Sequence, residues 1–287
     1  MPVKRNITFQ MKIKANAKIN IGLWVEDSRA DGYHNLQTVF YPIPVYDDLD
    51  IVARPDKKIC LTATCNGKEL PFAPQDNIVY KICRYFQNHY DISGVDIKLA
   101  KHIPMGAGLG GGSSDGSFTA ILLNRLFGLN LSQSTLEQLL AGFGADCAFF
   151  VRNSACYATG IGDKLENISL DLSGYELLLV KPPVEVSTAA AYSRVQSCKR
   201  PERLKDYVMR PVEQWQNTVL NDFEESVFKQ FDEIKRAKDM ITSLGADYAA
   251  MSGSGATVYG LFSSRLLADE QSLRKIFSGM YVKKVLL

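Results

Sequence analysis

The sequence predicts an α+β fold with two layers and two domains. Segments with strand and helix patterns are mixed along the chain, without the strict alternation that a doubly wound parallel sheet requires. The length of 287 residues corresponds to two domains, at about 150 residues each. A boundary near residues 160–164 fits these sizes, so we expect an N-terminal domain over residues 1–163 and a C-terminal domain over residues 164–287.

The clearest strand runs from residue 11 to residue 25. Apolar side chains alternate there with polar ones, among them Lys18 and Asn20, and a period of two is typical of a strand with one buried and one polar face. The patterns that follow predict strands at 38–46, 49–53, 95–103 and 149–158, helices at 77–90, 115–127 and 131–142, and a loop at 144–148.

The second half of the chain opens with a buried strand at 175–181. A polar, basic section at 197–210 is expected to be a surface insertion. Residues 225–244 place apolar side chains at spacings of three and four, which predicts one long helix, and Gly245 ends it. A glycine turn at 252–255 then leads into a strand at 257–262.

Charge and cysteine content exclude several classes of protein. Lys and Arg number 33 and Asp and Glu 31, so the net charge of +2 gives no large basic field for nucleic acid. No apolar run approaches the roughly 20 residues of a membrane span, and none follows Lys4 and Arg5 as in a signal peptide. The six cysteines form no C-x-x-C pair and accompany three histidines, so we expect no structural metal site and a reducing, cytoplasmic setting.

A glycine-rich loop between a predicted strand and a predicted helix is the most unusual segment. Glycine loses the most backbone entropy on folding, so five glycines in close succession indicate a backbone that approaches a ligand closely. The free N–H groups and the dipole at the start of a helix favour anions, and we therefore expect a bound phosphate chain. The loop consists of Pro104, Met105, Gly106, Ala107, Gly108, Leu109, Gly110, Gly111, Gly112, Ser113 and Ser114.

Two common types of nucleotide-binding loop match this segment only in part. It contains the G-x-G-x-x-G pattern of dinucleotide-binding folds, but no acidic residue lies between Asp115 and Glu137, where such a fold needs one. The lysine of a Walker loop is missing, because Ser113 follows Gly112. A nicotinamide enzyme is therefore disfavoured, and a merely flexible linker is not expected between so closely placed a strand and helix.

The loop resembles the central phosphate loop of the GHMP kinases, the superfamily of galactokinase, homoserine kinase and mevalonate kinase. Lys-Ile-Asn at 18–20 looks like their N-terminal motif, and Ser-Gly-Ser-Gly-Ala-Thr at 252–257 looks like their C-terminal one. Within the superfamily, the chain is most similar to kinases that act on a cytidine-diphosphate-linked methylerythritol. That similarity lies in Asp-Gly-Tyr-His at 31–34, Leu-Gln-Thr at 36–38, Gly-Ala-Asp at 144–146 and Asn-Asp-Phe-Glu at 221–224.

The resemblance covers residues 15 to about 262 and implies both fold and activity. It implies an N-terminal domain like domain 2 of ribosomal protein S5 and a ferredoxin-like C-terminal domain. It also implies phosphorylation of the tertiary 2-hydroxyl of that substrate by ATP, in the non-mevalonate isoprenoid pathway. Mg²⁺ is expected with ATP, bound mostly through phosphate oxygens, with Ser113 or Ser114 as a further ligand. We expect a small-molecule substrate, no nucleic-acid or membrane partner, and a monomer or weak homodimer.

By the same resemblance, Asp146 matches the catalytic carboxylate of the family and Lys18 its catalytic lysine. Phosphoryl transfer needs in-line positioning and a group that accepts the alcohol proton. Asp146 is expected either to accept that proton or to orient the hydroxyl, and Lys18 to keep Asp146 ionised or to polarise the hydroxyl. Without the resemblance, a helix-capping aspartate and a solvated strand lysine remain alternatives.

The remaining site residues also come from the resemblance. It implies that His34 hydrogen-bonds the cytosine and that Tyr33 stacks on it. The chain departs from the family pattern around the second aromatic wall of this pocket, where phenylalanine is more frequent, and at Ala148, where proline is common. The other implied contacts are Asn20, Thr188 and Tyr192 for the substrate, and Asn77, with Asp76 before it, and Lys101 for adenine.

Two further functions stay open on the sequence alone. A homoserine or mevalonate-type kinase would use the same loop without the Asp-Gly-Tyr-His pocket. A binding module that senses a sugar or nucleotide without catalysis would need the fold only, although the presence of both Lys18 and Asp146 argues against it.

Overall fold

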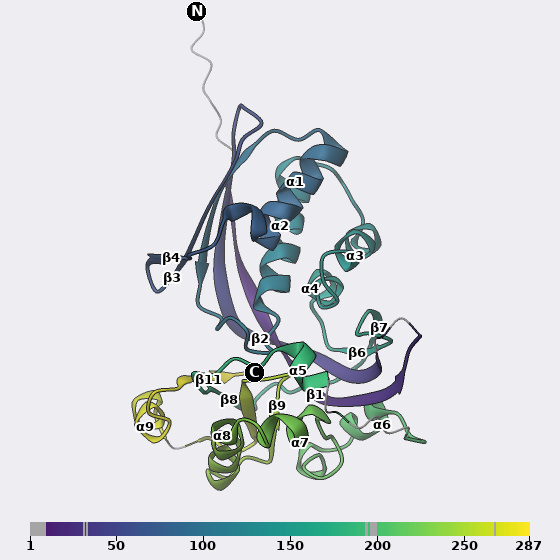
Figure 1. Ribbon diagram of the computed structural model, residues 1–287, viewed down its shortest axis with the longest axis vertical. Coiled ribbons are helices and arrows are strands. Elements are labelled where there is room, and N and C mark those ends of the chain that lie inside the picture. Colours follow the sequence, from purple (N-terminus) through teal and green to yellow (C-terminus); the bar gives the residue numbers. More distant parts are fainter. Residues whose placement is uncertain (1–9, 31, 33, 193–194, 196–199, 267) are drawn as a thin grey trace, which may run out of the picture. The chain divides into compact units, whose positions relative to one another are not determined.

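The computed structural model describes residues 10–30, 32, 34–192, 195, 200–266 and 268–287. By packing, the chain divides into two compact units that alternate along the sequence (Figure 1). Unit 1 contains Met1–Asn16, Val45–Ile103 and Gly111–Arg152, and unit 2 contains Ala17–Pro44, Pro104–Gly110 and Asn153–Leu287.

This division differs from contiguous domains over residues 1–163 and 164–287. The strands β1 (Gln10–Ser28) and β2 (His34–Ala53) each contribute residues to both units, because each is about 20 residues long. The boundary between the two family domains therefore stays a prediction.

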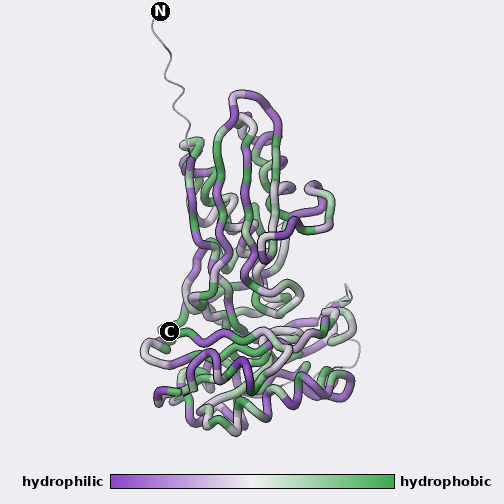
Figure 2. The backbone as a smooth tube through the Cα atoms, turned by 90° about the vertical axis from the view of Figure 1, so that its left-hand side faces the viewer, coloured by the Kyte–Doolittle hydropathy of each residue, from purple (hydrophilic) through white to green (hydrophobic). Residues whose placement is uncertain are grey.

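The sheet of unit 1 has the order β4 (Lys68–Glu69), β3 (Ile59–Cys65), β5 (Val95–Lys101) and β2, with β1 paired to β2. β5 is antiparallel to β2 and parallel to β3, so that Leu99 faces both Leu49 and Ala63. Along these strands hydrophilic and hydrophobic stretches alternate (Figure 2), and the apolar positions form the core. One face of the sheet is covered by α1 (Ile78–Tyr90) and α2 (Gly111–Leu126), while α3 (Gln133–Ala141) and α4 (Cys147–Arg152) pack on α2 (Figure 1).

In unit 2, β6 (Cys156–Thr159) pairs with β2 and with β7 (Lys164–Asn167). A second, antiparallel sheet has the order β11 (Tyr281–Leu286), β8 (Glu176–Lys181), β10 (Val258–Phe262) and β9 (Tyr248–Met251). Its core side chains, such as Val180 and Val258, pack with Ile241 of α8 (Asp232–Ser243). The other helices of this unit are α5 (Thr188–Tyr192), α6 (Leu204–Val208), α7 (Phe223–Phe228) and α9 (Glu270–Ile276).

Most predicted elements are confirmed, and the α+β class is confirmed by two sheets with helices packed on them. The strand at 38–46 and the strand at 49–53 are one continuous β2. Ser132 caps α3 as the sequence suggests, with its hydroxyl accepting from Thr135 N. Gly245 has φ +90° directly after the last turn of α8 and ends that helix.

Three expectations are wrong. The expected strand at 149–158 begins as α4, because a short and mostly buried apolar run has no periodicity that separates strand from helix. The single helix at 225–244 is two helices, since Phe231 leaves helical geometry at φ −131° and ψ +80°. The helix expected from residue 115 starts at Gly111, so half of the glycine run is its first turn. Among the helices that the structure describes, none combines the length and hydrophobicity needed to cross a bilayer.

Candidate active site

Three motifs that are far apart in the sequence meet in unit 2. Lys18 N donates to the carbonyl of Leu109 at 3.0 Å, which ties the first motif to the glycine loop. The Ser252 hydroxyl donates to the carbonyl of Gly108 at 2.8 Å and accepts from Asn20 N at 3.1 Å. Residues 18–20, 104–110 and 252–257 therefore form one hydrogen-bonded cluster.

Gly108 shows why this loop needs glycine. Its φ of +72° is left-handed, and a Cβ there would lie 2.0 Å from the carbonyl oxygen of Ser252. Gly106 and Gly110 also have positive φ, at +58° and +68°. These backbone conformations are costly for other residues. Packing against Ser252, and not only approach to a ligand, thus accounts for part of the glycine content.

The other half of the loop starts α2 in unit 1 and presents the anion-binding geometry that the sequence suggests. Gly112 is exposed, and a Cβ there would meet no atom within 4 Å, which leaves room for a ligand beside the first turn. The free N–H groups of this turn favour a phosphate. The two serines that follow the glycines differ in burial. Ser114 is buried and its hydroxyl donates to Asn16 O at 2.6 Å, whereas Ser113 is only half-buried.

The residues at the loop fit Mg²⁺ that is carried by ATP. Within the described ranges, no group of three or more His, Cys, Asp or Glu side chains could hold a metal ion. Mg²⁺ with nucleotides is held mostly by phosphate oxygens and water, with one or two protein ligands. Ser113, in the first turn of α2, is a side chain that would supply one of them.

Lys18 is buried, with 3% of its surface exposed, so the expectation of a solvent-facing polar side of β1 is wrong beyond Lys14. Its ammonium donates to Asn20 Oδ1 and lies 4.9 Å from the centre of the Phe40 ring. The Asn20 amide in turn donates to the Thr38 hydroxyl at 3.0 Å. A buried ammonium is costly unless it is hydrogen-bonded, and this chain of contacts fixes the direction in which Lys18 points.

Asp146 is half-buried in unit 1, in the turn that directly precedes α4. The free N–H groups at the start of a helix interact favourably with a negatively charged side chain placed there. The same position is that of a helix cap, so capping and catalysis are both compatible with the local geometry. The variant that separates them is Asp146→Asn, because asparagine caps a helix as well as aspartate does.

Lys101 belongs to a buried ionic cluster at the base of α2. Its ammonium contacts Asp47 and, at 2.6 Å, Asp115. Burial would lower the pKa of Lys101, but attraction to Asp115 and Asp47 outweighs it and raises the pKa. Burial, partly offset by Lys101, raises the pKa of Asp115 above its usual range. A Cβ on Gly111 would lie 3.3 Å from the ammonium, so the cluster adjoins the first residue of α2.

The sequence analysis did not predict a role for the two carboxylates of this cluster, although the pattern of β2 contains an indication for one of them. Asp47 falls on the same face of β2 as Val45, Leu49 and Ile51, which are all buried. A carboxylate on an apolar face requires a buried partner. Contact of Lys101 with adenine stays a prediction.

Asn77 is the N-cap of α1, where its side-chain oxygen accepts from Val79 N at 2.9 Å. The side-chain amide nitrogen takes no part in that bond. A contact of Asn77 with adenine, like any role of the exposed Asp76, stays a prediction.

His34 and Tyr192 lie together in unit 2. Their rings are stacked, with centroids 5.5 Å apart and an interplanar angle of 16°. Tyr192 also makes an edge contact with Phe223, with ring centroids 4.7 Å apart. Thr188 exchanges a hydrogen bond of 3.2 Å with Ser254 of the C-terminal motif. Tyr33 lies outside the described residues.

The Asn-Asp motif at 221–222 holds the C-terminal glycine turn. The Asn221 amide donates to the carbonyls of Met251 and Gly253, at 2.7 and 2.8 Å. The Asp222 carboxylate accepts hydrogen bonds from the two terminal guanidinium nitrogens of Arg200, at 2.9 and 2.8 Å. Leu204 and Val208 of α6 are also fully buried, so the expectation that the basic section at 197–210 is a surface insertion is wrong at these positions.

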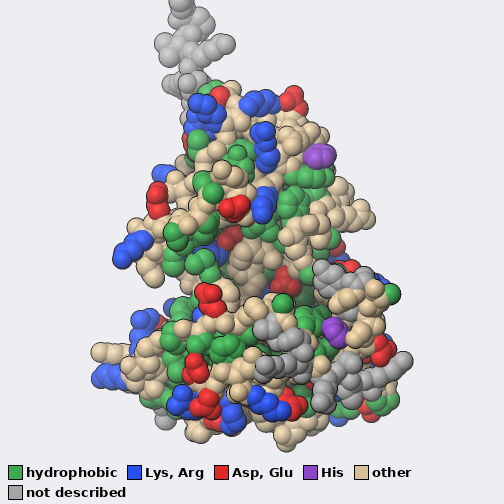
Figure 3. Space-filling view, viewed as in Figure 1, with side chains coloured by type: hydrophobic (Ala, Val, Ile, Leu, Met, Phe, Trp, Pro, Cys, Tyr) green, Lys and Arg blue, Asp and Glu red, His purple; other side chains and the backbone are tan. Residues whose placement is uncertain are grey.

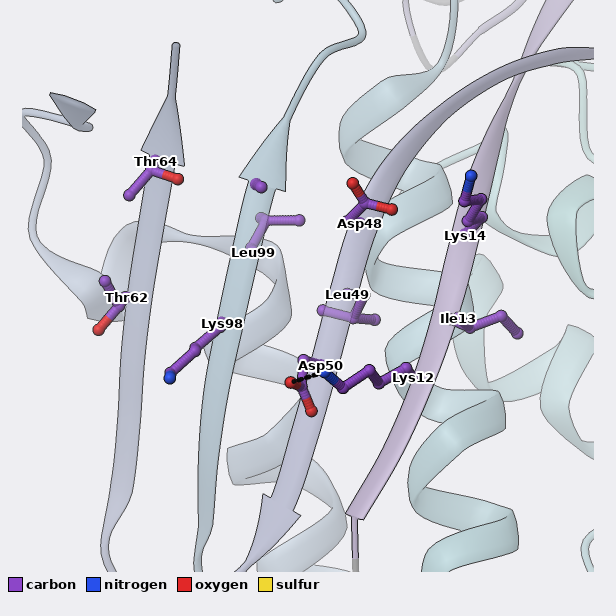
Figure 4. A pocket seen from close by; sticks show the side chains of 11 residues that line it. Lys12, Ile13, Lys14, Asp48, Leu49, Asp50, Thr62, Thr64, Lys98 and Leu99 are labelled. Carbon is purple, nitrogen blue, oxygen red and sulfur yellow. Dashed lines mark ion pairs between the residues drawn. The ribbon is translucent and has the colours of Figure 1, made fainter. Parts of the chain in front are cut away.

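A depression of about 700 Å³ lies elsewhere, on the face of the unit 1 sheet that α1 and α2 leave open (Figure 4). Its charged side chains come from neighbouring strands, and Lys12 pairs with Asp50 at 3.2 Å. No sequence-predicted site residue lines it. On the face shown in Figure 3, basic and acidic side chains are interspersed, in keeping with the small net charge.

Comparisons with known proteins identify the family of the chain. The family models for the GHMP kinases N terminal domain and the GHMP kinases C terminal match residues 77–154 and 208–280. A relative from Bacteroides fragilis (strain YCH46), named 4-diphosphocytidyl-2-C-methyl-D-erythritol kinase, is 48% identical over 86% of this chain and 90% of its own length. A relative of the same name from Cytophaga hutchinsonii is 42% identical over 87% of this chain and 92% of its own length.

Solved structures give the same result. A crystal structure of 4-(cytidine 5'-diphospho)-2C-methyl-D-erythritol kinase matches with a TM-score of 0.77 and 26% identity, over 96% of this chain and 98% of that chain. The Methanococcus jannaschii mevalonate kinase shares the fold, with a TM-score of 0.68 at 14% identity over 99% of both chains. The chain belongs to the GHMP kinases and, within them, to the family of the 4-diphosphocytidyl-2-C-methyl-D-erythritol kinases.

Proposed function

We propose that this ATP-dependent small-molecule kinase transfers the γ-phosphoryl group of ATP to the 2-hydroxyl of 4-diphosphocytidyl-2-C-methyl-D-erythritol. The observation that carries the proposal is the cluster in which Lys18, Gly108 and Ser252 bring three kinase motifs into contact. The substrate follows from the names of relatives that are 42–48% identical over most of this chain.

The phosphates of ATP lie at the glycine loop in this proposal. The N–H groups of the first turn of α2, at Gly111 and Gly112, bind phosphate oxygens, and the open space beside Gly112 accommodates them. Mg²⁺ bound with the nucleotide neutralises phosphate charge, and Ser113 is the residue that would hold it. Asn77 and Lys101 are proposed to lie near the adenine.

The acceptor hydroxyl needs a proton acceptor and a compensating charge. Asp146 takes the proton of that hydroxyl, or orients the hydroxyl for in-line attack. Lys18 contributes positive charge from a buried position that Asn20 fixes. Electrostatic stabilisation from such a fixed and buried group is larger than from a mobile one in water.

The cytosine base is held by aromatic groups. The stacked rings of His34 and Tyr192, together with Tyr33, form its proposed pocket, and Thr188 and Asn20 contact the rest of the substrate. A histidine ring that hydrogen-bonds the base edge distinguishes cytosine from uracil, because the exocyclic group changes from donor to acceptor.

Steady-state ATP consumption with three acceptors tests the proposal. We expect turnover with 4-diphosphocytidyl-2-C-methyl-D-erythritol and background rates with homoserine and mevalonate. Turnover of homoserine or mevalonate instead would assign another activity within the superfamily, and no ATP consumption with any acceptor would indicate a binding protein.

The finer expectations about partners rest on the sequence. We propose a monomer or weak homodimer with no nucleic-acid or membrane partner, in a cytoplasmic setting. Sedimentation velocity across a range of protein concentrations tests the oligomeric part.

A further inference from the structure

We propose that Ser117 and Cys147 position Asp146. They would do so by linking the turn that contains Asp146 to the first turns of α2 through hydrogen bonds and packing. This inference rests on the proposed function, in which Asp146 acts on the acceptor hydroxyl. It adds two positioning residues that neither touch substrate nor belong to the kinase motifs of the sequence.

Ser117 makes the first link. Its hydroxyl lies 2.8 Å from the carbonyl oxygen of Ser113, one turn earlier in α2, and 2.8 Å from the carbonyl oxygen of Cys147. Cys147 is the first residue of α4 and follows Asp146 directly. One hydroxyl proton thus joins the backbone of the phosphate-binding helix to the backbone next to the carboxylate.

Cys147 makes the second link with its side chain. Its thiol is within hydrogen-bonding reach of the Ser113 and Ser117 hydroxyls. A Cβ on Gly144 would lie 3.3 Å from this sulfur and 3.4 Å from Ser113 Oγ, so the start of the Asp146 turn packs directly on the same atoms. The turn from Gly144 to Cys147 is also closed on itself, because Cys147 N donates to Gly144 O at 3.0 Å.

The contacts are suited to positioning and not to chemistry. Ser117 and Cys147 are both fully buried, so their polar atoms do not reach a bound substrate. Asp146 lies in a turn, and the backbone of a turn has fewer fixed hydrogen bonds than a helix. The two links transfer the rigidity of α2 to that turn and fix the distance from the carboxylate to the helix start that binds phosphate. An error of about 1 Å in such a distance costs on the order of 100-fold in rate.

Two matched pairs of variants test the proposal by steady-state kinetics. The first pair is Ser117→Ala and Thr119→Val. Thr119 is also a buried hydroxyl of α2, but it donates only to the Asp115 carbonyl of its own helix, at 2.7 Å. We expect Ser117→Ala to lower kcat at least about tenfold while KM for both substrates changes less than about threefold, because the lost interaction positions the reacting group. Thr119→Val should keep kcat within about twofold.

The second pair is Cys147→Ala and Cys83→Ala. Both cysteines are fully buried, but Cys83 lies in the apolar core of α1. We expect similar losses of thermal stability from the two cavities and a fall in kcat only for Cys147→Ala. The conservative variants Ser117→Thr and Cys147→Ser, which retain a hydrogen-bonding group, should recover most of the rate. Should Ser117→Ala not fold, the cysteine pair makes the same comparison.

The outcomes separate this inference from the proposed function. Equal kcat losses within either pair, or loss of kcat without recovery by the conservative variants, would overturn the positioning role. Asp146→Asn is assayed alongside. If it retains normal turnover, the proposed role of Asp146 fails first, whereas a strong loss in Asp146→Asn with none in Ser117→Ala and Cys147→Ala refutes only the positioning role.

Discussion

Substitution of Gly108 by alanine tests whether the glycine loop is held by the C-terminal motif. Two costs are visible in the structure. A φ of +72° is left-handed and costs about 1–2 kcal/mol for a residue with a Cβ. The new Cβ would also lie 2.0 Å from the carbonyl oxygen of Ser252, and relief of such overpacking costs about 1–3 kcal/mol.

Together these terms predict that Gly108→Ala lowers the free energy of unfolding by about 2–5 kcal/mol. For a chain of this size, that corresponds to a fall in Tm on the order of 10 °C. Gly128→Ala is the matched control, since Gly128 has φ +60° and open space around its Cβ position, so only the backbone term applies there. We expect a loss of about 1 kcal/mol for that variant.

Gly112→Ala completes the series, because its Cβ meets nothing within 4 Å and its φ is not left-handed. It should keep or slightly raise the stability, since alanine is the better helix former, while KM for ATP rises as the methyl group fills the space for phosphate. Thermal unfolding and ATP kinetics on the three variants are the assay. Equal stability of Gly108→Ala and Gly128→Ala would refute the role of the Ser252 contact, and an unchanged KM in Gly112→Ala would refute the phosphate site.

Further predictions concern the buried charges and the base. Lys101→Met removes the buried cation that both Asp47 and Asp115 contact, and should destabilise the protein by about 3–5 kcal/mol in urea unfolding. Because the pKa of Asp115 is raised above its unfolded value near 3.8, its contribution to stability is full below that value and is lost as pH rises through the folded pKa. Asp115→Asn, which leaves Lys101 and Asp47 in place, should therefore flatten the decline of stability between about pH 4 and about pH 8. His34→Ala should reduce the preference for the cytidine substrate over its uridine analogue by about 10- to 100-fold, mainly through KM, whereas Lys18→Ala should lower kcat and keep the preference. An undiminished preference in His34→Ala would refute the assignment of the base pocket.

Local sequence patterns were sufficient to predict much of the fold. The alternation in β1, the apolar spacing of α8 and the cap at Ser132 each express an interaction between near neighbours in the chain. The glycine loop was likewise recognisable, because left-handed backbone at Gly106, Gly108 and Gly110 leaves glycine as the residue without strain.

The features that local patterns did not predict depend on contacts between residues that are far apart in the sequence. Lys18 stands in a polar alternation that predicts exposure, yet it is buried because β1 is covered on both faces from residue 15 onward. The contact that restricts Gly108 comes from Ser252, more than 140 residues away. α4 was expected as a strand because six residues are too few to display a helical period, and its buried environment accepts either structure. Tertiary packing decided each of these cases.

The kcat of the wild-type protein and of Asp146→Asn, with ATP and 4-diphosphocytidyl-2-C-methyl-D-erythritol, tests the central claim most directly. Asparagine preserves the shape of the side chain and the capacity to cap a helix, and removes only the proton-accepting charge. We predict turnover by the wild-type protein, with product phosphorylated at the 2-hydroxyl by ³¹P NMR. We also predict a fall in kcat of about 10²–10⁴ in a folded Asp146→Asn variant, the usual scale for a group that handles a proton. Near-normal turnover by that variant, or no turnover by the wild-type protein, would contradict the claim.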